Sequence, residues 1–171
     1  MEVSILRNKL NIFIYIILSL AILLTVGFIF SNSIKSPEES SKQSQEVVDT
    51  LRPIVDPNGQ ISDKDLTHKV RKSAHFLEFA LLGFELSLLT FFAKKRFSVN
   101  ALIYSASLSL LIATVDEYIQ SLTNRGSSVT DVLIDLSGAC TGILFGLAVA
   151  FAIAIAAKAI TKNKNKMLAE V

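Results

Sequence analysis

Four long apolar runs set the pattern of this chain. The first, Ile12 to Phe30, contains no charged residue, and the others cover His75 to Ala93, Val99 to Val115 and Val129 to Ala157. Each run is long enough to cross about 30 Å of hydrocarbon as a helix. The pattern therefore predicts an all-α fold, a bundle of four transmembrane helices. The last run is longer than a bilayer requires, so we expect this helix to tilt or to extend beyond the membrane.

The polar segment between the first two runs predicts a helical cap. Ser36-Pro37-Glu38-Glu39 has a capping serine, a proline at the first helical position and a glutamate at the third, which is the capping-box pattern. Pro53 and the turn Asp56-Pro57-Asn58-Gly59 should end this helix. Its apolar stripe consists of Val47, Val48, Leu51 and Ile54. We expect the helix to lie over the outer mouth of the bundle or on the lipid surface, with a partner-binding helix as the alternative.

A second capping box, Ser62 with Asp65, predicts where the next helix begins. Nothing breaks the helical pattern from there to Lys72, so this helix should continue into the second apolar run. The end of the cap segment and the second span would then form one long helix.

The composition agrees with an integral membrane protein. Of the 171 residues, 51% are apolar and 19% are charged, which leaves too little polar surface to cover a soluble globule of this size. One domain covering residues 1–171 is sufficient. The net charge of +2 is explained by cytoplasmic flanks that anionic lipids attract, so it indicates no nucleic-acid partner. Cys140, in the fourth run, is the single cysteine, so an intramolecular disulfide is excluded.

The basic residues that flank the apolar runs predict the orientation. They precede the first run, fill the turn after the second and follow the fourth: Arg7, Lys9, Lys94, Lys95, Arg96, Lys158, Lys162, Lys164 and Lys166. Cytoplasmic flanks carry such an excess, so we expect a multi-pass protein of the cell membrane with both termini in the cytoplasm. A cleaved signal peptide is the competing interpretation of the first run. Because that run is long and Ser31-Asn32-Ser33 is a poor cleavage site, we expect a retained anchor.

Ionisable and amide side chains gather at the ends of the last three runs. They are Arg71, Lys72, His75, Glu78, Asp116, Glu117, Gln120, Arg125, Asp131 and Asp135. Helical spacing gives each of the three spans one polar stripe, because steps of three, four or seven residues return to the same face. In the predicted topology all three stripes meet at the extracytoplasmic face. Charged groups at membrane depth are costly and usually mark a functional site, so these residues form one candidate polar site.

Glycines mark the packing face of the fourth span. Gly138, Gly142 and Gly146 recur at four-residue spacing, and on a helix they share a face with Asp131 and Asp135. Such a stripe of small residues lets another helix approach closely. It predicts that the two carboxylates point toward a neighbouring helix. We expect packing within one chain, with a homodimer face as the alternative.

The basic residues of the candidate site allow two interpretations. Arg71, Lys72 and Arg125 either form interfacial ion pairs that anchor helix ends, or form a cationic cradle for a phosphate or carboxylate on a lipid or peptidoglycan precursor. His75 has three possible roles, as a hydrogen-bond donor to an acid of the site, as a proton-transfer group or as a metal ligand. The first role is the simplest.

The acids of the candidate site need neutralisation, because the helix dipole stabilises an exposed carboxylate by only about 1 kcal/mol. Basic side chains or a bound cation can supply it. The hard oxygen ligands for a divalent cation would be Glu78, Asp116, Glu117, Asp131 and Asp135. No compact metal motif defines such a site, and the arginines compete for the same carboxylates, so no cofactor is assigned. Glu85 lies deeper, and we expect it to be protonated or hydrogen-bonded to a serine of the third span.

Three sequence blocks resemble the signature blocks of the VanZ-like membrane proteins. They are RKSAHFLEF (Arg71 to Phe79), DEYIQ (Asp116 to Gln120) and RGSSVTDVLIDLSG (Arg125 to Gly138), in that order. The resemblance runs from about Ser31 to the end of the fourth span. The family takes its name from an accessory factor for teicoplanin resistance, so the resemblance implies a role in the cell envelope without naming a reaction.

The residues and the resemblance together predict an integral membrane protein of the cell envelope. Its extracytoplasmic polar site would bind or modify an envelope lipid or a cell-wall precursor and thereby affect antibiotic resistance, namely glycopeptide sensitivity. The alternative is a non-enzymatic accessory or scaffold subunit that recruits an envelope partner through the cap helix. The sequence assigns no catalytic residue.

Overall fold

The structure, a computed structural model, describes residues 2–94 and 99–169. Within these residues it forms five helices: α1 (Glu2–Ser33), α2 (Pro37–Val55), α3 (Asp63–Lys94), α4 (Val99–Leu122) and α5 (Val129–Ala169). No strand occurs in the described ranges. α1, α3, α4 and α5 each contain a segment long and apolar enough to cross a membrane. The predicted all-α fold, with four such helices and a helical segment between the first two, is confirmed.

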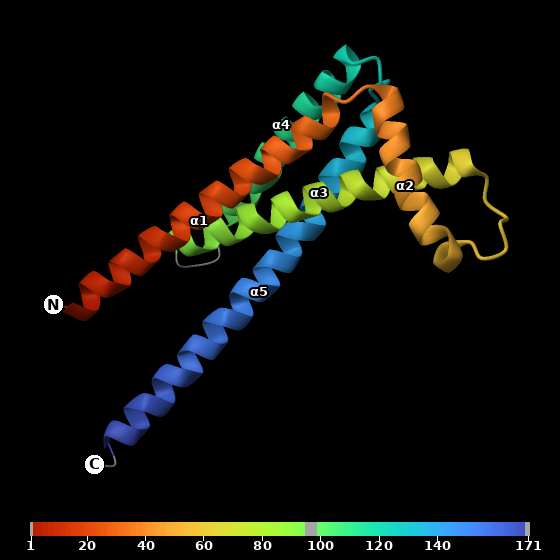
Figure 1. The fold of residues 1–171 in the computed structure, drawn as a ribbon. Coiled ribbons are helices and arrows are strands. Elements are labelled where there is room, and N and C mark those ends of the chain that lie inside the picture. Colours follow the sequence, from red (N-terminus) through yellow and green to blue (C-terminus); the bar gives the residue numbers. More distant parts are fainter. Residues whose placement is uncertain (1, 95–98, 170–171) are drawn as a thin grey trace.

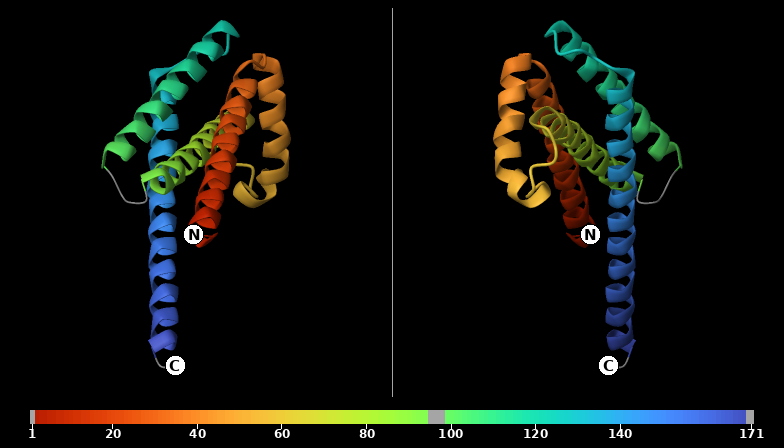
Figure 2. Two further views of the ribbon diagram at one scale, coloured as in Figure 1. Left: turned by 90° about the vertical axis from the view of Figure 1, so that its left-hand side faces the viewer. Right: turned by 90° about the vertical axis from the view of Figure 1, so that its right-hand side faces the viewer.

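α3 is the central helix, because it contacts each of the other four. It crosses α5 at a steep angle, while α1 and α4 flank the crossing (Figures 1 and 2). α1 and α4 end, and α2 and α5 begin, at the same end of the bundle (Figure 1). We call this the polar end, because the candidate site residues lie there.

The apolar core lies at the centre of the crossing. Its buried residues come from α1, α3, α4 and α5: Ile29, Phe79, Leu82, Leu86, Ile112, Ala113 and Ala139. Other large apolar side chains face outward, among them Leu24 (65% exposed) and Phe145 (64%). An apolar exterior of this kind is what a helix surface in contact with lipid requires.

α5 packs against α3 through glycines on both helices. A Cβ atom added at Gly142 of α5 would overlap the carbonyl oxygen of Ala80 on α3, and one added at Gly138 would meet the same helix in the same way. Gly146 lies against a side chain of α3, and an added Cβ at Gly83 of α3 would overlap the α5 backbone. At Gly83, Gly138 and Gly142 the two backbones are therefore too close for a larger residue unless the helices move apart.

α2 begins at its predicted capping box. Ser36 Oγ accepts a hydrogen bond from the Glu39 N–H at 3.2 Å, and the Glu39 carboxylate accepts one from the Ser36 N–H at 2.9 Å. Of the two predicted end signals, Pro53 was wrong, because it lies inside the helix, whereas the turn is confirmed, because α2 ends at Val55 and Asp56 caps it. Proline removes one N–H, and an exposed last turn tolerates that loss. The next N–H groups still bond normally, since Asp56 N donates to Arg52 O at 2.9 Å.

The buried face of α2 differs from its apolar stripe. Ser40, Ser44 and Val48 are the residues that α2 buries. The remaining stripe residues are largely exposed, for example Leu51 (39%) and Ile54 (80%). α2 therefore covers α3 with small polar side chains and leaves most of its apolar stripe free for the surroundings.

α3 runs unbroken from Asp63 to Lys94, as predicted. Its cap is simpler than predicted, because Ser62 Oγ accepts from the Asp65 N–H at 3.2 Å while its hydroxyl, not its N–H, donates to the Asp65 carboxylate at 2.7 Å. α5 continues to Ala169, and its C-terminal part projects from the bundle (Figures 1 and 2). Lys95 and Arg96 of the basic turn lie outside the described residues.

Candidate functional site

Three helices bring His75, Asp116 and Asp135 face to face at the polar end. They come from α3, α4 and α5, respectively. His75 Nδ1 lies 3.7 Å from Asp116 Oδ2 and 3.7 Å from Asp135 Oδ1. Both carboxylates are fully buried (0% exposed), and the imidazole side chain is 16% exposed. The structure thus joins one residue from each of the three predicted polar stripes.

Asp116 accepts hydrogen bonds at both carboxylate oxygens. Its Oδ1 accepts from the hydroxyl of Ser33 on α1. Its Oδ2 accepts from Gln120 Nε2, one turn further along α4, at 2.8 Å. Both donors are neutral, so they stabilise an ionised carboxylate without cancelling its charge.

Glu117 joins the end of α4 to the start of α5. Its Oε2 accepts from the backbone N–H of Ser128 at 2.9 Å, and its Oε1 accepts from Gln120 Nε2 at 3.0 Å. Ser128 immediately precedes α5, where unpaired N–H groups and the positive end of the helix dipole favour a carboxylate. Glu117 therefore has a structural role that its position in the sequence did not reveal.

α1 supplies polar partners that the sequence interpretation left out. Asn32 Nδ2 donates to Glu78 Oε1 at 2.8 Å, and Thr25 Oγ1 donates to Glu85 Oε1 at 3.1 Å. Of the two alternatives expected for Glu85, the hydrogen bond to a serine of the third span was wrong, because its partner among the described residues is Thr25 of α1. A signal was present, since the seven-residue step from Thr25 to Asn32 places both on one helix face.

Two residues of the α4–α5 loop cap the end of α1. Arg125 Nη1 donates to Asn32 O at 2.7 Å, and Thr123 Oγ1 donates to Ser33 O at 3.2 Å. Carbonyl groups at a helix C-terminus lack partners within the helix and attract cations. Burial and the nearby charge of Arg71 lower the pKa of Arg125 from its usual value. The two guanidinium groups are therefore close enough to repel each other.

Lys72 and Arg71 are neighbours in sequence but differ in their contacts. Lys72 Nζ lies 3.0 Å from Asp131 Oδ1, which pairs α3 with the first turn of α5. Arg71 is half-buried. Among the residues that the structure describes, it forms neither an ion pair nor a side-chain hydrogen bond. Arg71 is thus a cation near the buried acids without a counter-ion in the described ranges.

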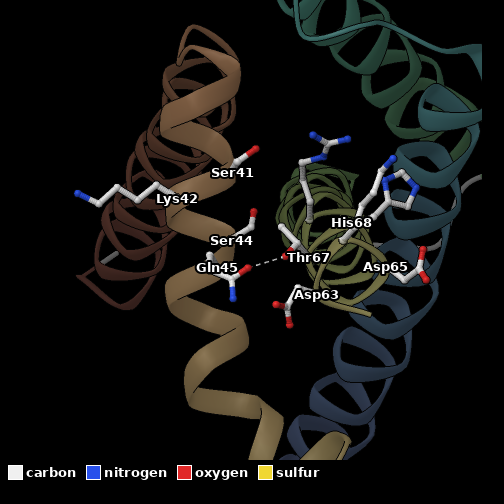
Figure 3. Close-up of a pocket in the computed structure, with 10 residues that line it drawn as sticks. Ser41, Lys42, Ser44, Gln45, Asp63, Asp65, Thr67 and His68 are labelled. Atoms are coloured by element: carbon white, nitrogen blue, oxygen red, sulfur yellow. Dashed lines mark hydrogen bonds between the residues drawn. The ribbon is translucent and has the colours of Figure 1, made fainter. Parts of the chain in front are cut away.

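Three cavities share Arg71 as a lining residue. An open groove of about 740 Å³ separates α2 from α3, and Gln45 accepts a hydrogen bond from Thr67 across it at 2.9 Å (Figure 3). A cavity of about 100 Å³ lies beneath α2 and is lined by Glu78 and His75. A cavity of about 10 Å³ lies beside His75 and between α3, α4 and α5. Arg71 therefore borders both the groove under α2 and the small cavities beside His75.

Several buried polar atoms have no hydrogen-bond partner within the described ranges. They are His75 Nδ1, Glu78 Oε2, Glu85 Oε2, Arg125 Nε, Asp131 Oδ1 and both carboxylate oxygens of Asp135. Asp131 Oδ1 still has the Lys72 ammonium at 3.0 Å. An unsatisfied buried polar group costs about 1–3 kcal/mol. Asp135 is the least satisfied residue of the site, because it is fully buried and neither of its oxygens is bonded.

The cation ligands expected from the sequence divide into two groups. Glu78, Glu117 and Asp131 are engaged with an amide, a backbone N–H and a lysine, respectively. His75, Asp116 and Asp135 each offer one ligand atom, and these three atoms lie within 4.8 Å of one another. If the site holds a metal ion, these three residues are the ones placed to bind it.

The comparisons with known proteins identify a family. The family model described as VanZ/LLP1 matches residues 13–152, which include the apolar part of α1, the whole polar end and the glycines of α5. Neither a curated protein nor a solved structure matches the chain. Because the match covers most of the sequence, this multi-pass membrane protein belongs to the VanZ/LLP1 family.

Proposed function

We propose that this chain acts at the extracytoplasmic face of the cell membrane, where its polar end binds the anionic headgroup of an envelope lipid or a cell-wall precursor. The proposal rests on the surroundings of Arg71. This residue lines three cavities and has no counter-ion among the described residues. A guanidinium group binds phosphate through two parallel hydrogen bonds, so an unpaired arginine in a cavity fits this ligand.

The arrangement of the helices supports the orientation. The start of α1, the end of α3 and the start of α4 lie at the opposite end of the bundle from the candidate site (Figure 1). The basic flanks of the sequence belong to those helix ends and to the C-terminal part of α5. Because cytoplasmic flanks carry the basic excess, the polar end faces the extracytoplasmic side in this proposal.

The surroundings of Arg71 support an anionic headgroup. Lys72 and Arg125 add two further positive charges nearby, and the low pKa of Arg125 reflects its burial and the repulsion from Arg71. A bound phosphate would relieve that repulsion. α2 covers the groove on one side, so a headgroup could enter under α2 while its acyl or prenyl chain stays in the bilayer.

Family membership supports the biological role. We propose that binding or modification of the envelope ligand alters sensitivity to teicoplanin-type glycopeptides, because the family takes its name from an accessory factor for teicoplanin resistance. Binding alone is sufficient for this role, and it is the part of the proposal that the described contacts support. Modification would require the buried acids next to Arg71.

A second candidate function is a non-enzymatic scaffold that recruits an envelope partner. The exposed apolar stripe of α2 favours it, since Val47, Leu51 and Ile54 are 41%, 39% and 80% exposed. The two functions predict opposite effects of polar substitutions in the stripe of α2. A scaffold loses function when the stripe becomes polar, as in Leu51→Ser with Ile54→Ser, whereas a headgroup site tolerates that change.

Lipid binding tests the proposal directly. The full chain in nanodiscs should bind a polyprenyl phosphate at least about 10-fold more tightly than the matching polyprenol, because a charged pair inside a cavity contributes about 1.5–3 kcal/mol. Arg71→Gln should remove this preference. Lys69→Gln is the matched control, because Lys69 is an exposed lysine on the same helix. Equal binding of phosphate and alcohol, or an unchanged preference in Arg71→Gln, would overturn the proposal.

A further inference from the structure

We infer that His75, Asp116 and Asp135 form a binding site for one divalent transition-metal ion, of the class of Zn²⁺ or Mn²⁺. This site lies deeper than the proposed headgroup site and does not depend on it, because a metal ion can be bound and measured without any lipid. The inference stands on the separation of the three groups, on their missing partners and on the absence of a competing cation.

The separations between the three groups are too long for direct bonds and suit a shared ion. His75 Nδ1 lies 3.7 Å from an oxygen of each carboxylate, which exceeds the length of a hydrogen bond. Two ligands at about 2.0–2.2 Å from one tetrahedral ion are about 3.4 Å apart. The three groups thus face one another at nearly the spacing that a metal ion between them would impose.

The hydrogen-bond partners that these side chains lack also indicate a metal ion. Asp135 is fully buried, and within the described residues both of its oxygens, like His75 Nδ1, lack hydrogen bonds. Asp116 is bonded only to the neutral donors Ser33 and Gln120. Two buried carboxylates that lie so close together cannot both stay ionised without a positive charge between them. A dication supplies that charge.

The lysines and arginines in the described part of the polar end do not supply it. Lys72 is paired with Asp131, and Arg125 donates to the carbonyl oxygen of Asn32. No lysine or arginine in the described part of the chain pairs with Asp116 or Asp135. The competition from arginines that the sequence suggested is therefore absent at these two acids.

The donor set and the cavity define the class of ion. One imidazole nitrogen with two carboxylate oxygens suits Zn²⁺ or Mn²⁺ better than Mg²⁺, which prefers oxygen ligands and keeps several waters. The cavity of about 10 Å³ that His75 and Asp135 line has room for about one water molecule. A metal ion with three protein ligands and one water in this cavity would have the open coordination position typical of a functional site.

Metal binding by the purified full chain tests the inference. The background variant carries His68→Gln and Cys140→Ala, which removes the other histidine and the free cysteine as ligands. After treatment with a chelator, this protein in detergent should bind one Zn²⁺ or Mn²⁺ per chain. At 100-fold excess over Kd, the ion should raise Tm by about 5 °C or more, whereas Mg²⁺ at the same concentration should not.

Substitution of the ligands should remove the effect. Asp135→Asn and His75→Gln should each weaken binding by at least about 100-fold, more than the 10- to 100-fold loss typical of residues that only orient a ligand. Glu85→Gln is the matched control, a buried acid of α3 that bonds to Thr25 outside the cluster, and it should bind the ion as the background does. Unchanged affinity in Asp135→Asn, or no stoichiometric ion in the background protein, would overturn the inference.

A spectroscopic measurement keeps the test decisive if the variants fold poorly. Co²⁺ in place of Zn²⁺ in the background protein should give the visible absorption bands of a cobalt ion with nitrogen and oxygen ligands. His75→Gln should shift these bands. A spectrum identical to that of aqueous Co²⁺ would contradict the site without relying on any variant, and it would leave the headgroup proposal untouched.

Discussion

Gly142 on α5 lies directly against the backbone of Ala80 on α3. A Cβ atom at Gly142 would overlap the Ala80 carbonyl oxygen. Both helices are long and apolar enough to span a membrane. The point where they pack against each other places His75 opposite Asp135. The distance between two backbones thus determines the geometry of the candidate site, because a wider crossing would separate the two side chains.

Gly142→Ala should destabilise the protein by about 1–3 kcal/mol, because the added methyl group forces the two backbones apart. Gly142→Leu should cost more. Gly27→Ala is the matched control, since nothing lies within 4 Å of a Cβ at that exposed helical glycine, and alanine there should be neutral or stabilising. The measurement is Tm in detergent. Equal effects of the alanine substitutions at Gly142 and Gly27 would show that the glycines do not hold the crossing.

Arg125→Ala should also destabilise the protein, by about 1.5–3 kcal/mol, because it removes a charged hydrogen bond to the end of α1. Arg71→Gln is the matched comparison at a neighbouring arginine. Arg71 has no protein partner among the described residues, so its loss should leave Tm nearly unchanged. Chemical or thermal unfolding in detergent measures both variants. Equal loss of stability in the two would mean that Arg71 makes a structural contact and is not free for a ligand.

Much of the fold was predictable because it depends on local properties. The lengths of the apolar runs defined the four spans, and the capping box at Ser36 defined the start of α2. The face of α2 that packs against α3 was not predictable from the apolar stripe of this helix. In water a stripe of this kind would be buried, but next to a membrane it can remain exposed, so the small residues Ser40 and Ser44 contact α3 instead.

The candidate site was predictable to the extent that topology decides which helix ends meet. The predicted topology placed His75, Asp116 and Asp135 at the same end of the bundle, and this prediction required no information on side-chain packing. The contribution of α1 was not predictable in this way, because the first apolar run carries no charge and its neighbours depend on helix packing. Neutral donors such as Ser33 and Asn32 therefore bond to acids for which basic side chains or a bound cation were expected as partners.

The turn between α2 and α3 should make stability depend on pH. Asp56 accepts hydrogen bonds from the N–H groups of Gln60 and Ile61, at 2.8 and 2.9 Å. The bond from Ile61 is the main cause that lowers the pKa of Asp56 below its ordinary value of 3.8. A carboxylate with a lowered pKa stabilises the folded state above the unfolded pKa, and this contribution is lost as pH falls through the folded pKa.

Asp56→Asn should therefore lower Tm relative to the wild type above about pH 5, with a smaller difference at more acidic pH. Glu46→Gln, an exposed acid on α2, is the control and should show no such trend. Tm measured across this range in one detergent is sufficient. A difference between Asp56→Asn and the wild type that stays constant down to pH 3 would contradict the role of the carboxylate.

The proposed orientation predicts which positions a membrane-impermeant thiol reagent can reach. In a Cys140→Ala background, a cysteine at Asn58 in the α2–α3 turn should be labelled in intact cells. A cysteine at Lys95 should be labelled only after the cells are opened, because the basic turn belongs in the cytoplasm. Labelling of Lys95 but not of Asn58 in intact cells would reverse the orientation and move the candidate site to the cytoplasmic side.

Asp135→Asn should separate function from stability. In protein treated with a chelator, the substitution removes no hydrogen bond, because neither oxygen of Asp135 is bonded within the described residues. It also removes a buried charge, so the free energy of unfolding should stay the same or increase. Function should nevertheless be lost, because asparagine keeps the shape and removes the charge that a ligand requires. His75→Gln should behave in the same way, while Glu85→Gln should retain function. The measurement pairs Tm in detergent with the glycopeptide sensitivity of a complemented strain. Full function in folded Asp135→Asn would refute the functional role of the cluster, and a loss of function that follows a loss of stability would show that the cluster only holds the helices together.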